Sequence, residues 1–320
     1  MEGLIFIKEL IMKTKTIQKI IKAQIDDFIS YIDDESIKNI FKEQTIVTGG
    51  CITSMLLGED VNDFDIYLRT KEAAFKVAEY FLEKEATGSE LVLGGGITTI
   101  KSVEEKLGST VADSDSFFLK MIEDKDRVRI YIPSSGVINC SNNSPEPGES
   151  INQEVFVKNN TDKDTKYKTE YITSNAITLR NKIQIIIRFT GEPNEIHKNY
   201  DYEHCKNYWT SWDNKLITNV KSLECILAKQ LFYTGSKYPL CSIFRSKKFI
   251  QRGWSINAGQ YLKMAMQLNE IDLCDVETLE DQLVGVDSAY FMEIIRHLRD
   301  KKIKRVDNEY ITTIINKVFE

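Results

Sequence analysis

Residues 45–70 read TIVTGGCITSMLLGEDVNDFDIYLRT, and the expected fold can be worked out from this stretch. Thr45–Thr48 is a β-branched run that predicts a short strand, and Gly49–Gly50 breaks it. Cys51–Leu57 carries apolar residues that a short helix would bury, and Gly58 suits the left-handed conformation that ends a helix. The stretch therefore predicts a strand, a glycine turn and a short helix in direct succession.

A second strand is expected at the end of this stretch, and it carries two carboxylates. Side chains alternate between the faces of a strand, so Asp63 and Asp65 should share one face while Phe64 and Ile66 point into a core. Two carboxylates on one face raise each other's pKa unless a cation lies between them. The sequence therefore predicts a divalent metal site formed by Asp63 and Asp65.

The glycine turn predicts a nucleotide site beside this metal site. Oxygen ligands suit Mg²⁺, or Mn²⁺, which takes one or two carboxylates and completes its shell with water and phosphate. At Gly49 and Gly50 no side chain keeps a triphosphate from the backbone, and the helix N-terminus favours its negative charge. Ser54, one turn into the helix, could add a hydroxyl. An NTP substrate and two-metal nucleotidyl transfer are the chemistry that this spacing favours.

The segment GGCITSMLLGEDVNDFDIY resembles the signature of the DNA-polymerase-beta-like nucleotidyltransferase superfamily. It is most similar to the head domain of tRNA CCA-adding enzymes and bacterial poly(A) polymerases. The matching positions are Gly49, Gly50, Leu56, Leu57, Gly58, Asp63 and Asp65. Where that head carries an Arg-Asp pair, this chain has Thr53 and Ser54. The resemblance implies an α+β head with a mixed sheet and flanking helices, and the transfer of NMP from an NTP to an acceptor hydroxyl.

The same superfamily uses a third metal carboxylate on a neighbouring strand. Asp201, in the segment YDYEHC at 200–205, is our candidate, and Glu203 would lie on the same face of such a strand. Equally, Asp201 could cap a turn between a helix and a strand. We therefore carry Asp201 as a predicted catalytic and metal-binding residue, with both interpretations open.

A basic segment follows in an otherwise acidic protein. Arg245, Lys248 and Arg252 are spaced to share one helical face, and Trp254 follows them. Such a face can hold the phosphates of an NTP or of RNA, with Trp254 stacked on a base. The alternative is a solvated charged face with Trp254 in the core. The segments at 200–205 and 233–254 also resemble a group of tailed-bacteriophage nucleotidyltransferases.

Composition limits the class of protein. The chain has 320 residues, 42% hydrophobic and 28% charged, as expected for a soluble globular protein with one large or two ordinary domains. Its formal charge of −6 argues against a generally nucleic-acid-binding surface but leaves room for a local basic patch. No stretch approaches the length of a membrane span, and the first residues do not resemble a secretion signal. We therefore expect a cytoplasmic protein without a membrane partner.

The six cysteines lie singly, without a C-x-x-C pair, and the chain has only three histidines. This pattern argues against a zinc site and favours free thiols.

Periodicity predicts the remaining elements. Helices are expected at Thr16–Ile32, Asp34–Lys42, Lys71–Lys84 and Glu192–Asn199. Strands are expected at Phe117–Ile122, Val128–Ile132, Asn181–Arg188 (buried on both faces) and, as a hairpin, Val155–Val157 with Tyr167–Ile172. A flexible turn is expected at Gly94–Gly96 and a surface loop at Asn139–Glu149. From Ser222 onward four helices are expected, around Leu223–Phe232, Leu262–Leu268, Phe291–Leu298 and Ile311–Val318.

These elements suggest three parts: N-terminal helices over 1–44 that pack on the head, a catalytic domain over 45–212 and a helical nucleotide- or substrate-binding domain over 213–320. For the acceptor we favour an RNA, especially a tRNA 3′ end. Transfer to a protein or a small molecule is the alternative within enzymes, and a non-catalytic nucleotide-binding relative is the alternative outside them. The oligomeric state is open.

Overall fold

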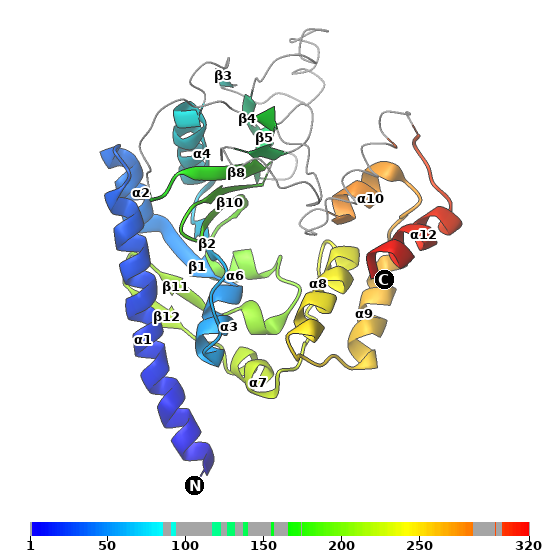
Figure 1. Ribbon diagram of the computed structural model, residues 1–320, viewed down its shortest axis with the longest axis horizontal. Helices are drawn as coiled ribbons and strands as arrows, with labels where there is room; N and C mark the ends of the chain where they lie inside the picture. The colour runs from blue at the N-terminus through cyan, green and yellow to red at the C-terminus, as the bar shows by residue number, and fades with distance from the viewer. Residues whose placement is uncertain are drawn as a thin grey trace. The chain divides into compact units, whose positions relative to one another are not determined.

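The computed structural model describes residues 2–85, 91–93, 117–122, 127–131, 137–139, 155–156, 166–173, 175–283, 298 and 303–319 (Figure 1). They form two compact units. The first takes its described residues from 1–145, 153–197 and 205–219, and the second from 198–204 and 220–320. The chain thus enters the second unit briefly at 198–204 before it returns to the first.

Two helices open the first unit. In α1 (Glu2–Ser30) the buried side chains recur at helical spacing: Ile17, Ile21, Ile25 and Phe28. The next helix, α2 (Glu35–Gln44), begins after Asp34, whose carboxylate accepts hydrogen bonds from the backbone N–H groups of Ser36 and Ile37 at 2.7 and 3.1 Å. Both helices predicted for this part of the chain are confirmed.

A mixed sheet organises the first unit. Among the described residues it has nine strands, in the order β12-β11-β1-β2-β10-β9-β8-β6-β7. They are β1 (Thr45–Thr48), β2 (Phe64–Leu68), β6 (Val137–Asn139), β7 (Val155–Phe156), β8 (Thr169–Thr173), β9 (Ala176–Leu179), β10 (Ile183–Thr190), β11 (Tyr208–Thr210) and β12 (Lys215–Ile217). Strand β1 is antiparallel to both β2 and β11, whereas β2 and β10 are parallel. The predicted mixed sheet is confirmed.

Helices flank this sheet (Figure 1). α4 (Lys71–Glu85) packs against β10 and β2, whereas α3 (Gly50–Leu57) packs against β2 and α1. The face of α4 that packs is apolar and fully buried: Ala74, Val77, Ala78, Phe81 and Leu82. A short helix, α6 (Pro193–His197), follows β10. The helices predicted in these regions are confirmed.

A smaller sheet also belongs to the first unit. It consists of β3 (Leu91–Leu93), β4 (Phe117–Ile122) and β5 (Arg127–Tyr131) within the described residues. Strand β4 pairs in parallel with β3 and antiparallel with β5. The two strands expected from sequence here, β4 and β5, are confirmed.

The strand expected at Asn181–Arg188 is confirmed as β10, but its burial on both faces and one expected strand pairing are wrong. In β10, Ile183, Ile185 and Ile187 are buried, but Gln184 and Ile186 are partly exposed, so one face of this strand is only half covered. The expected hairpin between β7 and β8 does not form, because β6 pairs with both of them and lies between them. The glycine turn expected at 94–96, most of the loop expected at 139–149 and most of the helix expected around 291–298 lie outside the described residues.

The second unit is mainly helical. Its described helices are α7 (Val220–Ala228), α8 (Pro239–Gln251), α9 (Ala258–Leu268), α10 (Val276–Leu283) and α12 (Asn308–Phe319). An apolar cluster of Leu240, Phe244, Leu279 and Leu283 holds α8 against α10. The first helix was expected to reach Phe232, but it ends at Ala228, where Lys229 adopts a positive φ of 44°. The predicted α+β class, with a mixed sheet, flanking helices and a C-terminal helical region, is confirmed.

The cysteines at 51, 205, 225, 241 and 274 are free thiols, as expected. Among the helices that the structure describes, none is long and apolar enough to cross a membrane.

Candidate functional site

The turn between β1 and α3 requires a glycine at its first position. Gly49 has φ 102° and ψ −150°, a conformation that side-chain-bearing residues rarely adopt. Its N–H donates to the carbonyl oxygen of Cys205 at 3.2 Å, which fixes the turn. At Gly50 an added Cβ would meet no atom of the described residues within 4 Å, so among these residues the backbone is open at the N-terminus of α3. This is the approach that the sequence predicted for a phosphate.

A buried histidine holds the strand end that precedes this turn. The Thr48 hydroxyl lies 2.8 Å from both the Asn207 carbonyl oxygen and His197 Nε2. The Thr48 hydroxyl has one proton, which it donates to the Asn207 carbonyl oxygen. The same hydroxyl therefore accepts a hydrogen bond from His197, whose Nε2 carries the hydrogen. Burial first, and the charge of Lys206 second, lower the pKa of His197 to about 4. His197 is therefore a neutral donor that positions Thr48, a role that no local sequence signal indicated.

Helix α3 is almost wholly interior. Cys51, Ile52, Thr53, Ser54 and Leu56 are all buried, and Gly58 ends the helix with φ 70°. Ser54, predicted to touch the nucleotide, has only 4% of its surface exposed. A nucleotide role for its hydroxyl stays a prediction.

The two motif carboxylates lie at the start of β2. Asp63 is exposed and directly precedes β2, while Asp65 is half-buried within it. Phe64 and Ile66 are buried, as the alternation predicted. Burial first, and the negative charge of Asp65 second, raise the pKa of the Cys51 thiol. Asp65 therefore lies close to the first turn of α3, where the open backbone of Gly50 is.

This arrangement suits a hard divalent cation. Asp63 and Asp65 supply carboxylate oxygens, the ligand type that Mg²⁺ and Mn²⁺ prefer, and both ions leave coordination positions for water and phosphate. In the described part of the chain, no three His, Cys, Asp or Glu side chains are grouped so that they could enclose a metal ion by themselves. Two carboxylates alone would leave the remaining coordination positions of such a cation to water or phosphate.

Asp201, the predicted third carboxylate, belongs to the second unit. Its side chain is 9% exposed, and Oδ2 accepts a hydrogen bond from Arg245 Nη1 at 2.9 Å. The predicted strand around it is wrong: Tyr202 makes an isolated bridge to Tyr233, and Glu203–Cys205 is a 3₁₀ turn. Asp201 and Glu203 therefore do not share a strand face, and a metal role for Asp201 stays a prediction.

The basic segment is only partly as predicted. Arg245 and Lys248 lie on α8, Arg252 is its C-cap, and Lys248 is exposed. Arg245 pairs with Asp201, so two residues predicted for different tasks contact each other. The stacking role expected for Trp254 is wrong, because this side chain is 3% exposed and packs on His204, with ring centroids 4.4 Å apart.

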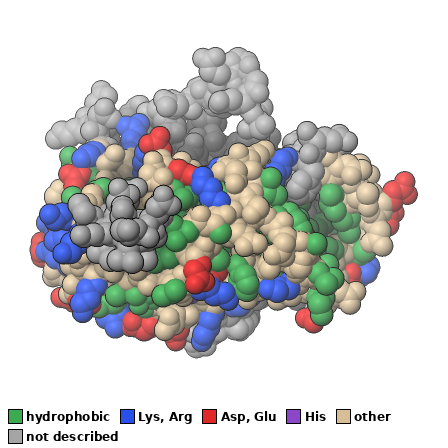
Figure 2. All heavy atoms as spheres, turned by 90° about the horizontal axis from the view of Figure 1, so that it is seen from below, with side chains coloured by type: hydrophobic (Ala, Val, Ile, Leu, Met, Phe, Trp, Pro, Cys, Tyr) green, Lys and Arg blue, Asp and Glu red, His purple; other side chains and the backbone are tan. Residues whose placement is uncertain are grey.

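The second unit also contains two lysines beside one aromatic ring, which the sequence analysis did not predict. Lys221 Nζ and Lys263 Nζ lie 3.8 and 4.3 Å from the ring centroid of Phe232. Three separate segments supply these residues, so no spacing pattern could have revealed them. On the face drawn in Figure 2, basic side chains are interspersed with acidic and apolar ones, as the net charge suggested.

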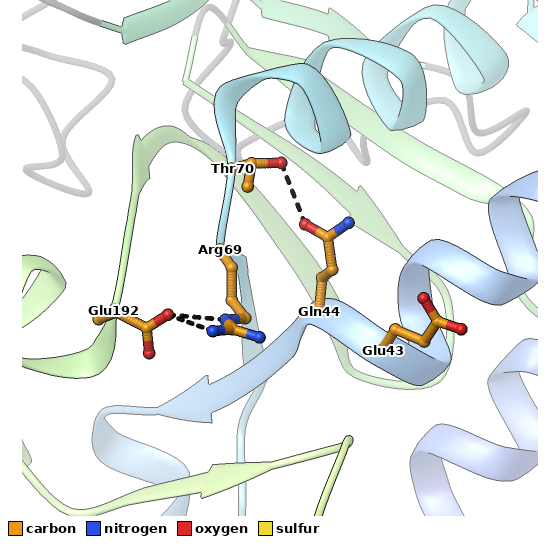
Figure 3. A pocket seen from close by; sticks show the side chains of 5 residues that line it. All are labelled: Glu43, Gln44, Arg69, Thr70 and Glu192. Carbon is orange, nitrogen blue, oxygen red and sulfur yellow. Dashed lines mark hydrogen bonds and ion pairs between the residues drawn. The ribbon is translucent and has the colours of Figure 1, made fainter.

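A cavity of about 450 Å³ lies at the opposite end of β2 from Asp63. It is lined by Glu43, Gln44, Arg69, Thr70 and Glu192 (Figure 3). Arg69 Nε donates to Glu192 at 2.8 Å, and Thr70 donates to Gln44 at 3.0 Å. Because the Arg69 guanidinium is paired with the Glu192 carboxylate, this cavity has little positive charge to attract a triphosphate.

Comparison with known proteins gives a family. Among solved structures, the Thermotoga maritima CCA-adding enzyme complexed with tRNA is similar at 13% identity and a TM-score of 0.37, over 87% of this chain and 54% of that chain. This chain thus spans about half the length of that enzyme's chain. No curated protein sequence matches it significantly. The profile of the Gabija anti-defense 2 family matches residues 19–229, well over half of the chain, and the protein therefore belongs to the Gabija anti-defense 2 family.

Proposed function

We propose that this protein is a metal-dependent nucleotidyltransferase that transfers NMP from an NTP to an acceptor hydroxyl. One observation carries the proposal: an open helix N-terminus at Gly50 lies beside a half-buried carboxylate, Asp65, and the exposed Asp63 precedes it by two residues. Helix N-termini bind phosphate through backbone N–H groups, and paired carboxylates bind divalent cations. Nucleotidyl transfer needs both side by side.

Each residue of this site has a role in the proposed reaction. The backbone at Gly49 and Gly50 holds the triphosphate, and Asp63 and Asp65 hold Mg²⁺ or Mn²⁺. The bound cation would neutralise charge on the triphosphate. The acceptor hydroxyl oxygen forms a bond to the α-phosphorus and loses its proton to water, while the bond to the bridging oxygen breaks and pyrophosphate leaves. The protein contributes mainly positioning and charge.

We propose an RNA 3′ end as the acceptor. Exposed Lys248 and the neighbouring Arg252 support this choice, because cations on one helix can follow a phosphate backbone. The family description favours a second candidate. An anti-defense protein could transfer NMP to a protein of the Gabija system and so inactivate it.

The test is incubation of the purified protein with each α-labelled NTP and Mg²⁺ or Mn²⁺, separately with total RNA and with the proteins of a Gabija system. Label in RNA supports the first acceptor and label in protein the second. Label in neither, with every NTP, would contradict the proposed transfer and favour a non-catalytic nucleotide-binding protein. Asp65→Asn is the matched control: we expect it to transfer no label, and full transfer by this variant would contradict the proposed site.

A further inference from the structure

A row of polar side chains crosses the centre of the main sheet. The register pairs Asp65 of β2 with Gln184 of β10, and Gln184 with Thr178 of β9. Paired residues of neighbouring strands share a face and lie about 5 Å apart. The rows before and after it point to the opposite face of the sheet, which is apolar and buried: Phe64, Ile183 and Leu179 in one row, Ile66, Ile185 and Ile177 in the other. The polar row therefore lies on the less covered face of the sheet, and in it Gln184 stands between Thr178 and the carboxylate of Asp65.

The hydrogen bond made by Gln184 defines the orientation of its side-chain amide. Nε2 donates to the Thr178 hydroxyl at 3.1 Å, so this nitrogen faces β9. The two ends of a planar amide point apart, so Oε1 faces β2, the strand of Asp65. Among the residues that the structure describes, Thr178 is the only hydrogen-bond partner of this amide.

An amide oxygen beside a carboxylate is unfavourable unless a cation lies between them, because both groups only accept hydrogen bonds. The oxygen of a Gln side chain is also a ligand that hard divalent cations accept. We propose that Gln184, through Oε1, is the third protein ligand of the divalent cation held by Asp63 and Asp65. This inference rests on the proposed function, and it assigns to Gln184 the place that the sequence led us to expect for Asp201.

A glutamine ligand and a third carboxylate ligand would give the site different charges, and this difference can be tested. With Gln184 the site has two negative ligands, and with a third carboxylate it would have three. Cation affinity in oxygen sites depends on the number of charged ligands. Gln184→Glu should therefore tighten Mn²⁺ binding by about tenfold, whereas Gln184→Met, similar in size but without the oxygen, should weaken it by about tenfold or more. Thr178→Val removes the anchor of the amide and should weaken binding by a smaller factor.

The experiment is a Mn²⁺ titration of the full chain without nucleotide, followed by the electron paramagnetic resonance signal of free Mn²⁺. Wild type, Asp65→Asn and the variants of Gln184 and Thr178 are compared. Ile186→Met is the matched control, since Ile186 is partly exposed on the same face of β10 and should leave the affinity unchanged. Thermal unfolding of each variant in EDTA establishes that it folds.

The outcomes separate the two proposals. If Asp65→Asn abolishes Mn²⁺ binding while Gln184→Met and Gln184→Glu bind as wild type does, the Gln184 assignment is overturned and the proposed function stands. If wild type binds no Mn²⁺, or Asp65→Asn binds as tightly as wild type, both proposals fail. Opposite shifts for Gln184→Glu and Gln184→Met, with Ile186→Met unchanged, support the assignment.

Discussion

The segment around the glycine turn of the first unit and the basic segment of the second unit were both expected to bind nucleotide, yet they relate to the sequence differently. In the first, Gly49 to Asp65 form one continuous unit in which consecutive elements contact each other, and every expected element is present. In the second, Arg245 is paired with Asp201 and Trp254 is buried against His204. A group of site residues that contact one another within one short segment can be predicted from their spacing. Residues that share only a helix face cannot, because their role depends on what the fold packs against that helix.

The largest difference between the two regions should appear in catalysis. Asp63→Asn and Asp65→Asn remove charge at the proposed reacting centre, so we expect NMP transfer to fall by at least about a thousandfold. Arg245→Gln should lower it far less. Initial rates with a labelled NTP measure this, and unfolding curves should show that Asp63→Asn folds as wild type does, because Asp63 is exposed. Full activity in either Asp variant would contradict the site.

Each unit also contains a buried neutral histidine, and lowering the pH tests both. Burial lowers the pKa of His197 from 6.5 to about 4 and that of His204 to about 3. In the unfolded chain each ring binds a proton at its ordinary pKa, so acid favours unfolding. The free energy of unfolding should therefore be highest above pH 6.5 and should fall as the pH drops toward the pKa of the folded state. For His197 this amounts to roughly 3 kcal/mol between pH 6.5 and 4.

Urea unfolding at several pH values measures this loss, and NMR titration of the rings assigns it. His197→Gln keeps a side-chain donor for Thr48 and should flatten the pH dependence between 6.5 and 4. A measured pKa near 6.5 for His197 would show that its ring is not held neutral by burial.

The two glycines of the turn should respond in opposite ways. Gly50→Ala fills open space at a position without a positive φ, so stability should be unchanged. The added methyl group would keep a triphosphate from the backbone and lower kcat/KM by about a hundredfold. Gly49→Ala should instead destabilise by about 1–2 kcal/mol, because its φ of 102° is strained with a side chain. Wild-type kinetics in Gly50→Ala would remove the turn from the nucleotide site.

The Asp201–Arg245 pair tests whether the second region is structural. Arg245→Gln leaves a largely buried carboxylate without its cation and should destabilise by about 1–2 kcal/mol. Adding Asp201→Asn should recover most of this loss, as chemical denaturation of the two single variants and the double variant would show. Should Asp201→Asn abolish transfer at unchanged stability, Asp201 would act at the reacting centre as the sequence suggested.

The smallest effect concerns RNA. Lys248→Gln with Arg252→Gln removes two cations from the end of α8, so the slope of log binding constant against log salt should become shallower by up to about 1.4 units on a single strand. Filter binding at several salt concentrations measures the slope. Replacing Lys221 and Lys263 instead shows whether the cations around Phe232 bind RNA. If the salt dependence of RNA binding is unchanged when Lys248 and Arg252 are replaced, these side chains do not bind RNA and form only a solvated face.

The elements around the proposed metal and nucleotide site could be predicted from the amino-acid sequence. Two glycines, a short apolar run and an alternating Asp-Phe-Asp-Ile segment permit one local structure, because strand alternation, the glycine-only φ and the helix C-cap act over a few residues. The helices at both ends of the chain could be predicted from the helical spacing of their apolar residues.

The distant residues that support or occupy these sites could not be predicted in this way, because the three-dimensional fold brings them together. His197 contacts Thr48 across about 150 positions, Gln184 faces Asp65 through sheet register, and Asp201 meets Arg245 on a helix 44 residues away. None of these pairs leaves a pattern in the chain. Strand order and the packing of buried polar groups select them, and both are properties of the assembled fold, in which residues far apart in sequence become hydrogen-bond partners.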